Sequence, residues 1–227
     1  ESQGLVYGIA QPLSPAKVFS AFISYDTKRQ DKSRGCDQTP QNILYIAEIL
    51  EHYPHASIFH MIRDPRAILL SQKNRWRRPF LSDSIPKKEA IRYWLNYHPI
   101  TMSQLWKANV STADQFLEDE RVYTLRYEDL LTDPEKEVEK ICQFANVMFS
   151  PDMLKVPQVN SSSQRDQPKQ EGIDKDRANS WRKGGLTSTE MFLCQKMNKA
   201  VMAAHDYEID AVFPNPVALV LSILIFP

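Results

Sequence analysis

The protein has 227 residues, of which 42% are hydrophobic, and 28 lysines and arginines balance 28 aspartates and glutamates. A chain of this length can bury the core of one α/β domain without metals or disulfides. The net charge of zero argues against a protein that binds nucleic acid or a membrane surface through its overall charge, so an anion site must be a local cluster. Cys36, Cys142 and Cys194 are odd in number and widely spaced, which suits reduced thiols better than a disulfide framework.

Segments with a strand pattern alternate with segments with a helix pattern along the chain. Apolar spacing, turn residues and helix caps predict this order. We expect a strand at 17–24, a helix from Gln41 to Tyr53, a strand at 55–62, a helix from Pro65 to about Trp76, a helical segment at 87–117 broken near His98, a strand at 121–127, a helix beginning near Thr132, and a helix at 187–205. Such alternation is typical of a parallel sheet covered by helices, and we predict a single α/β domain over residues 1–227.

Capping residues mark the starts of three of these helices. Asp64 precedes a proline, which is a common pair at the N-cap and first helical positions. Thr132 with Glu135, and Thr187 with Glu190, have the spacing of a capping box. These residues therefore predict where the three helices begin.

Two segments lie outside this alternation. Residues 150–179 are rich in Pro, Ser, Gln and charged residues, and we predict a polar surface loop there. The tail at 213–227 contains the mostly apolar run Val217–Phe226, which is well short of the roughly 18 residues that span a bilayer. We expect a buried strand or a docked tail, with a truncated membrane segment as the alternative.

Polar residues follow two of the predicted strands. Arg63 comes directly after one strand, and Tyr127 and Glu128 end the other. Because parallel strands end at the same edge of a sheet, where α/β proteins bind ligands, these residues are candidates for one site. Ser71 lies in the second turn of the helix after Arg63, so a guanidinium and a hydroxyl can serve one anion such as a phosphate. The alternative is that Arg63 pairs with Asp64 or Glu128 while Ser71 only packs.

A second basic cluster lies in the segment 180–186. Arg182 and Lys183 stand beside Gly184, where the backbone can approach an anion closely. The alternative for this segment is a solvated loop. For Arg66, in the first turn of the helix after Arg63, we expect a surface charge.

Four segments of the chain carry a family resemblance when they are taken together and in order. They are SRGCDQTP at 33–40, IFHMIRDPRAILLSQ at 58–72, YTLRYEDLLTDPEKEVEKICQF at 123–144 and SWRKGGL at 180–186. They resemble the sulfotransferases that use 3′-phosphoadenosine-5′-phosphosulfate (PAPS), and the resemblance spans roughly residues 36–207. It implies a three-layer α/β/α fold with a central parallel sheet, related to the P-loop NTPases.

The resemblance also implies a set of residues that bind the sulfuryl donor, and no metal. Arg63 and Ser71 would hold the 3′-phosphate of PAPS, Tyr127 would lie near the adenine, and Arg182, Lys183 and Gly184 would also reach the 3′-phosphate. The implied reaction is transfer of the sulfuryl group to a hydroxyl or amine of an acceptor. The acceptor can be a glycan, a steroid or phenol, a lipid or a peptide tyrosine, and the sequence does not decide among them.

The sequence departs from the family pattern in two places. No P-R-S-G-T loop for the 5′-phosphosulfate is present, and Gln38 stands where some members have a lysine. We expect that the sequence begins partway through the domain, while the alternative is a non-catalytic relative or inactive fragment that keeps the 3′-phosphate half-site. A kinase or nucleotidase would require a G-x-x-x-x-G-K-[ST] loop, which the sequence lacks.

No catalytic base is assigned from the sequence. His98 is the internal candidate, and we interpret it as a packed or surface residue. Trp94, Tyr97 and Trp106 stand at helical spacing, and we interpret them as core residues rather than acceptor contacts. No leader peptide is visible, and we expect a cytoplasmic location, with the Golgi lumen as the alternative.

Overall fold

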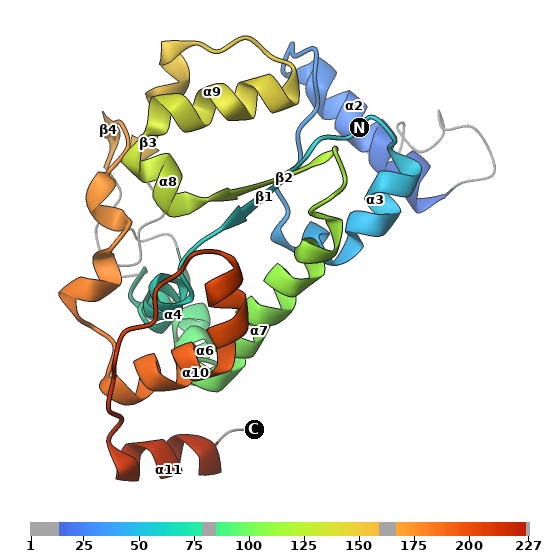
Figure 1. Ribbon diagram of the computed structural model, residues 1–227. Helices are drawn as coiled ribbons and strands as arrows, with labels where there is room; N and C mark the ends of the chain where they lie inside the picture. The colour runs from blue at the N-terminus through green and yellow to red at the C-terminus, as the bar shows by residue number, and fades with distance from the viewer. Residues whose placement is uncertain (1–13, 79–84, 159–166, 226–227) are drawn as a thin grey trace. The chain divides into compact units, whose positions relative to one another are not determined.

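A computed structural model of the protein describes residues 14–78, 85–158 and 167–225 (Figure 1). The chain divides into two compact units, Glu1–Ala56 and Ser57–Pro227, and each is described by itself. A single domain over the whole chain stays a prediction.

The first unit is helical where it is described. It contains α2 (Pro15–Arg29), the 3₁₀ helix η1 (Pro40–Tyr45) and α3 (Ile46–His52). The strand predicted at 17–24 is wrong, because this segment lies inside α2. The side chain of Ser14 accepts a hydrogen bond from Lys17 N at 3.3 Å, and this cap, with a proline at the first helical position, starts a helix despite the strand-like composition. The Tyr53 hydroxyl donates to the Ala16 carbonyl oxygen at 2.7 Å and fastens α2 to the end of α3.

Two strands form the parallel sheet of the second unit. They are β1 (Ile58–Ile62) and β2 (Val122–Arg126), as the sequence predicted. Their register pairs Ile58 with Val122 and Ile62 with Arg126. The residues that follow the two strands therefore leave the sheet side by side.

Helices make up most of the rest of the second unit. They are α4 (Pro65–Lys73), η2 (Arg75–Arg77), α6 (Lys87–Leu95), α7 (Pro99–Ala113), η3 (Asp114–Phe116), α8 (Tyr127–Thr132), α9 (Pro134–Ala145), η4 (Pro151–Leu154), η5 (Lys175–Arg177), η6 (Ser180–Lys183), α10 (Ser188–Ala204) and α11 (Pro216–Leu224). The break predicted near His98 is confirmed, because His98 caps α7 and separates it from α6. Its Nδ1 accepts a hydrogen bond from Ile100 N at 3.3 Å, so the ring has a structural role.

Two of the predicted caps are confirmed. The Asp64 carboxylate accepts a hydrogen bond from Arg66 N at 2.8 Å at the start of α4. Thr187 and Glu190 form a reciprocal capping box at the start of α10, with bonds of 3.2 Å and 2.7 Å. Both helices begin where the sequence placed them.

The capping box predicted for Thr132 and Glu135 is wrong. A short helix, α8, begins directly after β2 and still includes Thr132. Asp133 is the residue that caps α9, and its carboxylate accepts from Lys136 N at 3.5 Å. Because Thr132 is the last residue of α8, the N-cap of α9 is Asp133, one residue later than predicted.

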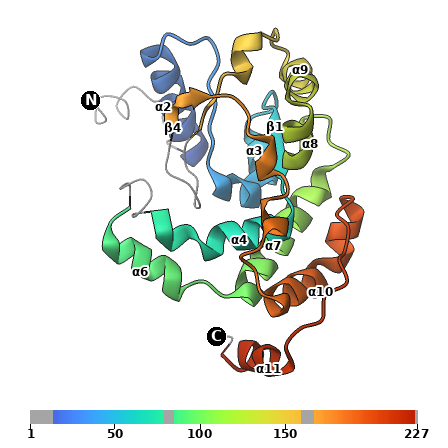
Figure 2. The ribbon, with the colours of Figure 1, turned by 90° about the vertical axis from the view of Figure 1, so that its left-hand side faces the viewer.

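The core of the second unit joins β1 to helices α7 and α10. Its buried members are Ile62, Trp106, Val110, Val201, Met202 and Tyr207. Figures 1 and 2 show α8 and α9 on one side of the two strands and α4, α7 and α10 on the other. The parallel strands thus lie between helical layers, which is the α/β arrangement that the sequence predicted.

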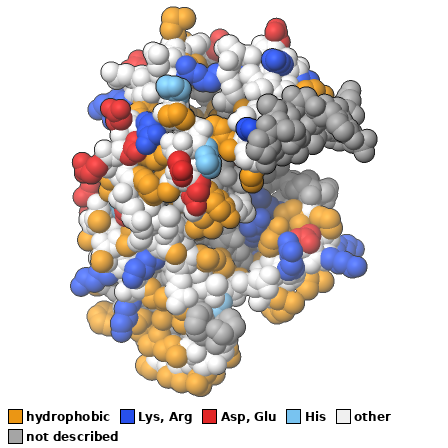
Figure 3. All heavy atoms as spheres, turned by 90° about the vertical axis from the view of Figure 1, so that its right-hand side faces the viewer, with side chains coloured by type: hydrophobic (Ala, Val, Ile, Leu, Met, Phe, Trp, Pro, Cys, Tyr) orange, Lys and Arg blue, Asp and Glu red, His pale blue; other side chains and the backbone are white. Residues whose placement is uncertain are grey.

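The polar segment and the apolar tail differ from the predictions. Residues 150–179 include a short antiparallel pair, β3 (Pro157–Gln158) and β4 (Gln167–Glu171), so the segment is not all loop. The tail is neither a buried strand nor docked, because α11 is helical and has no buried residue. Figure 3 shows hydrophobic side chains gathered at the bottom of the view, where α11 lies. No helix among the described residues is both long and apolar enough to cross a membrane.

Candidate functional site

Arg63 and Tyr127 meet where the two parallel strands end. Each is the first residue after its strand, and the guanidinium carbon of Arg63 lies 4.5 Å from the centre of the Tyr127 ring. The Arg63 carbonyl oxygen accepts a hydrogen bond from Trp106 Nε1 at 2.9 Å, which fixes the backbone at this point. The sequence prediction that these two residues lie together is confirmed.

The guanidinium of Arg63 is only partly satisfied by the protein. One terminal nitrogen donates to the Arg177 carbonyl oxygen at 3.2 Å. Its Nε is buried and has no hydrogen-bond partner among the residues that the structure describes. A buried, unsatisfied N–H of a charged group is costly, so this nitrogen has hydrogen-bonding capacity that the described residues do not use.

The carboxylates that were alternative partners of Arg63 are engaged elsewhere. Glu128 accepts from Asp64 N at 3.0 Å and from the Tyr207 hydroxyl at 2.9 Å. Burial, and then the neighbouring Glu128 carboxylate, raise the pKa of Tyr207, so this phenol stays a hydrogen-bond donor. Asp64 pairs with Arg66, and the alternative in which Arg63 pairs with Asp64 or Glu128 is wrong.

Arg66 is a buried structural residue, and the prediction of a surface charge is wrong. Its side chain is 2% exposed and pairs with Asp64 at 2.7 Å and Asp210 at 3.0 Å. It also donates to Gln195 Oε1 at 2.9 Å and lies 3.8 Å over the Trp181 ring. Arg66 therefore ties the start of α4 to η6 and to the chain beyond α10.

The basic segment at 182–184 covers the end of η6 and the glycine that follows it. Helix α4 packs against η6, and Ser71 is partly buried within α4. Arg182 is exposed and faces Asp210 at 3.4 Å, while Lys183 is exposed and pairs with Asp176 at 3.0 Å. Gly184 has a φ of 108°, a backbone conformation that favours glycine. The roles of these residues and of Ser71 in binding a phosphate stay predictions.

A polar network surrounds the carboxylate of Glu190, which lies shortly after this segment in the sequence. The carboxylate of Glu190 accepts from Lys73 Nζ at 2.7 Å, from the Tyr97 hydroxyl at 2.8 Å and from Thr187 N at 2.7 Å. Burial would raise the pKa of Glu190, but the hydrogen bonds from Lys73, Thr187 and Tyr97 together lower it. Burial raises the pKa of Tyr97, and the Glu190 charge adds to that shift. The capping box signalled Glu190, whereas no local pattern points to Lys73 or Tyr97.

Comparison with known proteins decides the family. The model of the sulfotransferase family matches residues 11–151, which is more than half of the chain. The chain belongs to the sulfotransferase family. Over 149 residues the chain is 26% identical to a putative protein-tyrosine sulfotransferase of Caenorhabditis briggsae, covering 65% of this chain and 49% of that protein. The chain thus spans about half the length of the curated relative it matches.

Solved structures support the fold of this family member. One similar structure is the sulfotransferase domain from the curacin biosynthetic pathway, with a TM-score of 0.52 and 20% identity over 82% of this chain and 68% of that one. Another is the sulfotransferase domain from the Synechococcus PCC 7002 olefin synthase, with a TM-score of 0.50 and 21% identity over 88% and 73% of the two chains. At this identity the likeness shows the α/β sulfotransferase fold alone.

Trp94, Tyr97 and Trp106 have three different environments. Trp106 is 6% exposed and belongs to the core, as predicted, whereas Trp94 is 62% exposed, so the core prediction for Trp94 is wrong. Tyr97 borders a cavity of about 180 Å³. The cavity is lined by Gln72, Arg75, Tyr93, Asn96, Tyr97 and Met102. One of its lining residues, Gln72, directly follows Ser71 in the sequence, and the lining offers aromatic and hydrogen-bonding side chains.

A larger cavity of about 270 Å³ borders β2. Its lining includes Arg126, Lys140 and His205 but neither Arg63 nor Ser71. In the described part of the chain, no group of three or more His, Cys, Asp or Glu side chains is placed to hold a metal ion. The candidate site for the donor is therefore the strand end at Arg63 together with α4 and η6.

Proposed function

We propose that this sulfotransferase takes the sulfuryl group from PAPS and transfers it to a hydroxyl or amine of an acceptor. The observation that carries the proposal is Arg63, which stands at the end of β1 with a buried Nε that has no partner among the described residues. A 3′-phosphate carries about two negative charges near neutral pH, and a guanidinium can engage it with two parallel hydrogen bonds. Tyr127 lies against the same guanidinium, and its aromatic ring would lie near the adenine.

Bound PAPS would supply a sulfuryl group whose transfer resembles phosphoryl transfer in kind. In such reactions, positioning in line and stabilisation of charge on the oxygens do most of the work. Arg63 and Ser71 would anchor the donor, and the exposed cations Arg182 and Lys183 would add positive charge near its 3′-phosphate.

The variant Arg63→Ala tests this assignment. We expect it to weaken binding of 3′-phosphoadenosine-5′-phosphate (PAP) by about 1.5–3 kcal/mol, the scale of a hydrogen bond to a charged group. Binding of adenosine-5′-phosphate (AMP) should change little, because AMP lacks the 3′-phosphate. Isothermal titration calorimetry measures both ligands, and Arg92→Ala, an exposed arginine on α6, is the control for loss of one positive charge. Equal losses for PAP and AMP would refute the role of Arg63.

A non-catalytic relative that binds PAP is the second candidate. The specific observation in its favour is Gln38, which is exposed and stands where some members have a lysine, in a sequence without a P-R-S-G-T loop. Chromatography that follows PAPS and PAP separates the two candidates. Conversion of PAPS to PAP that requires a phenol, amine or tyrosine peptide supports the transferase, while tight PAP binding without conversion supports the relative. The putative protein-tyrosine sulfotransferase among the similar proteins makes tyrosine peptides the first acceptors to try.

A further inference from the structure

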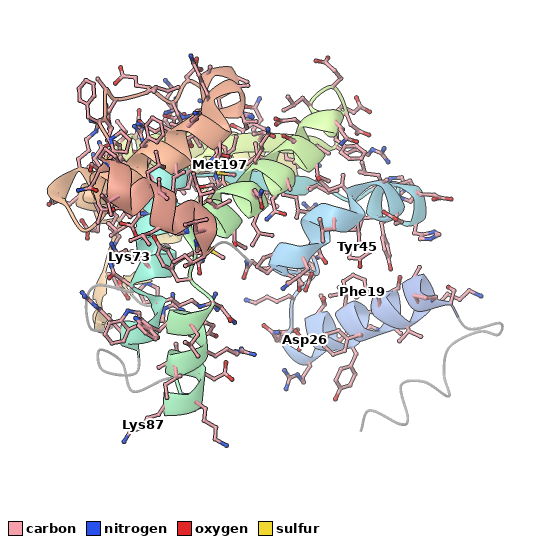
Figure 4. All side chains as sticks on the ribbon, turned by 90° about the horizontal axis from the view of Figure 1, so that it is seen from below. Phe19, Asp26, Tyr45, Lys73, Lys87 and Met197 are labelled. Atoms are coloured by element: carbon pink, nitrogen blue, oxygen red, sulfur yellow. The ribbon has the colours of Figure 1, made fainter. Side chains whose placement is uncertain are left out.

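A hydrogen bond from Lys73 holds the backbone at Gly185 against helix α4. Lys73 Nζ donates to the Gly185 carbonyl oxygen at 2.9 Å and to Glu190 Oε2 at 2.7 Å. Gly185 has a φ of 99°, and a Cβ added there would lie 2.7 Å from a methyl carbon of Leu70. The chain therefore lies against α4, the helix that also carries Ser71, at this point (Figure 4 labels Lys73).

The other end of the same segment is also fastened to α4. Trp181 is 3% exposed and lies under the guanidinium of Arg66, 3.8 Å from ring centre to guanidinium carbon. Between Trp181 and Gly185, the three intervening residues are exposed. The segment is thus a short exposed loop that is held at both ends on the helix that carries Ser71.

The hydrogen bond to the Gly185 carbonyl oxygen comes from a lysine in a partly buried ion pair, Lys73 with Glu190. The side chains of Lys73 and Glu190 are 30% and 12% exposed. Glu190 also accepts from the Tyr97 hydroxyl and from Thr187 N, so its carboxylate has a fixed orientation. Lys73 Nζ therefore bonds both to the Gly185 carbonyl oxygen and to the Glu190 carboxylate, which restricts the conformations of the lysine side chain.

We propose that Lys73 and Glu190 are positioning residues for donor binding, which act by holding the loop 182–184 beside Ser71. The inference rests on the proposed function, in which this loop and Ser71 approach one 3′-phosphate. The bond from Lys73 holds Gly185 against α4, the helix that also carries Ser71, so it limits where the loop can stand relative to that helix. A loop that is already ordered loses less conformational freedom when it binds an anion, and affinity rises accordingly.

The double variant Lys73→Met/Glu190→Gln tests this role without changing the net charge of the region. It removes one cation and one carboxylate together, so no buried charge is left unpaired. Calorimetry should show PAP affinity falling about fivefold to tenfold, the scale of a lost hydrogen bond, while AMP affinity stays within about twofold. The matched control is Asp152→Asn/Lys155→Met, which removes an ion pair whose side chains are 78% and 63% exposed. The control should bind both ligands like the native protein.

The variant Gly185→Ala provides a second test that changes no charge. The added Cβ would lie 2.7 Å from a methyl carbon of Leu70, and alanine is strained at the positive φ of this position. Both effects should displace the loop at Gly185, where Lys73 holds it. We expect the same selective loss of PAP affinity. The inference is overturned if folded variants bind PAP as the native protein does, or if PAP and AMP affinities fall equally. A native protein that does not distinguish PAP from AMP would instead contradict the proposed function, so the two failures are distinguishable.

Discussion

Replacing Arg66 by methionine should destabilise the protein strongly. The Arg66 side chain is 2% exposed, and its partner carboxylate on Asp64 is 7% exposed. Methionine fills much of the arginine volume, so the main loss is electrostatic, because the Asp64 carboxylate stays buried without its cation. Breaking such a buried pair on one side typically costs about 3–5 kcal/mol. We expect a loss of this size in the free energy of unfolding.

Urea unfolding followed by circular dichroism measures this loss, provided that the dependence on urea is unchanged. The matched control is Arg92→Met, in the same unit. Arg92 pairs with Glu89 three residues earlier, and the two side chains are 60% and 36% exposed. An exposed pair of this kind contributes about 1 kcal/mol or less. If Arg66→Met costs no more than Arg92→Met, the reasoning from burial is wrong.

Three further predictions follow from burial and hydrogen bonding. Burial raises the pKa of Cys194 to about 11, so iodoacetamide at pH 8 should alkylate the exposed Cys36 while Cys194 reacts only after unfolding, as mass spectrometry of peptides can show. The lowered pKa of Glu190 gives stability that is present above its ordinary pKa of 4.5 and lost as pH falls through the lower value of the folded state. As the pH falls below 4.5, the free energy of unfolding measured in urea should therefore decrease less for Glu190→Gln than for the native protein. Equal decreases for the two proteins would contradict this prediction. Trp106→Phe removes the donor to the Arg63 carbonyl oxygen and should lower the free energy of unfolding by about 1–3 kcal/mol, whereas an unchanged urea midpoint would count against that hydrogen bond.

Local patterns were enough to predict the elements that carry the site. The strands β1 and β2 are short apolar runs bounded by polar residues, and their parallel pairing places Arg63 beside Tyr127. The start of α4 at Asp64 and the break at His98 depend on neighbouring residues, so the sequence contains their full cause. These features could be predicted because each interaction is local or follows from the topology of parallel sheets.

Features that depend on distant partners could not be predicted. Arg66 is buried because Gln195 and Asp210, 129 and 144 residues away, receive its guanidinium. Lys73 finds Glu190 at a separation of 117 residues, and no local spacing signals that pair. A sequence pattern shows which residues can bear a charge, but only the tertiary structure shows which charges meet.

Two predictions failed because composition was weighed above helix caps. The segment 17–24 is rich in aromatic and branched residues, yet the cap at Ser14 starts a helix there. The apolar tail is likewise a helix, because the Asn215 side chain accepts from Ala218 N at 3.1 Å and a proline holds the first helical position. Capping residues were the stronger signal in both cases.

Calorimetric titration of the native protein with PAP, and in parallel with AMP, tests the central claim most directly. The account predicts that PAP binds at least about tenfold more tightly than AMP, because a charged hydrogen bond to the 3′-phosphate is worth roughly 1.5–3 kcal/mol. Equal affinities for the two nucleotides would show that Arg63 and its neighbours do not recognise the 3′-phosphate, and would contradict the proposed use of PAPS.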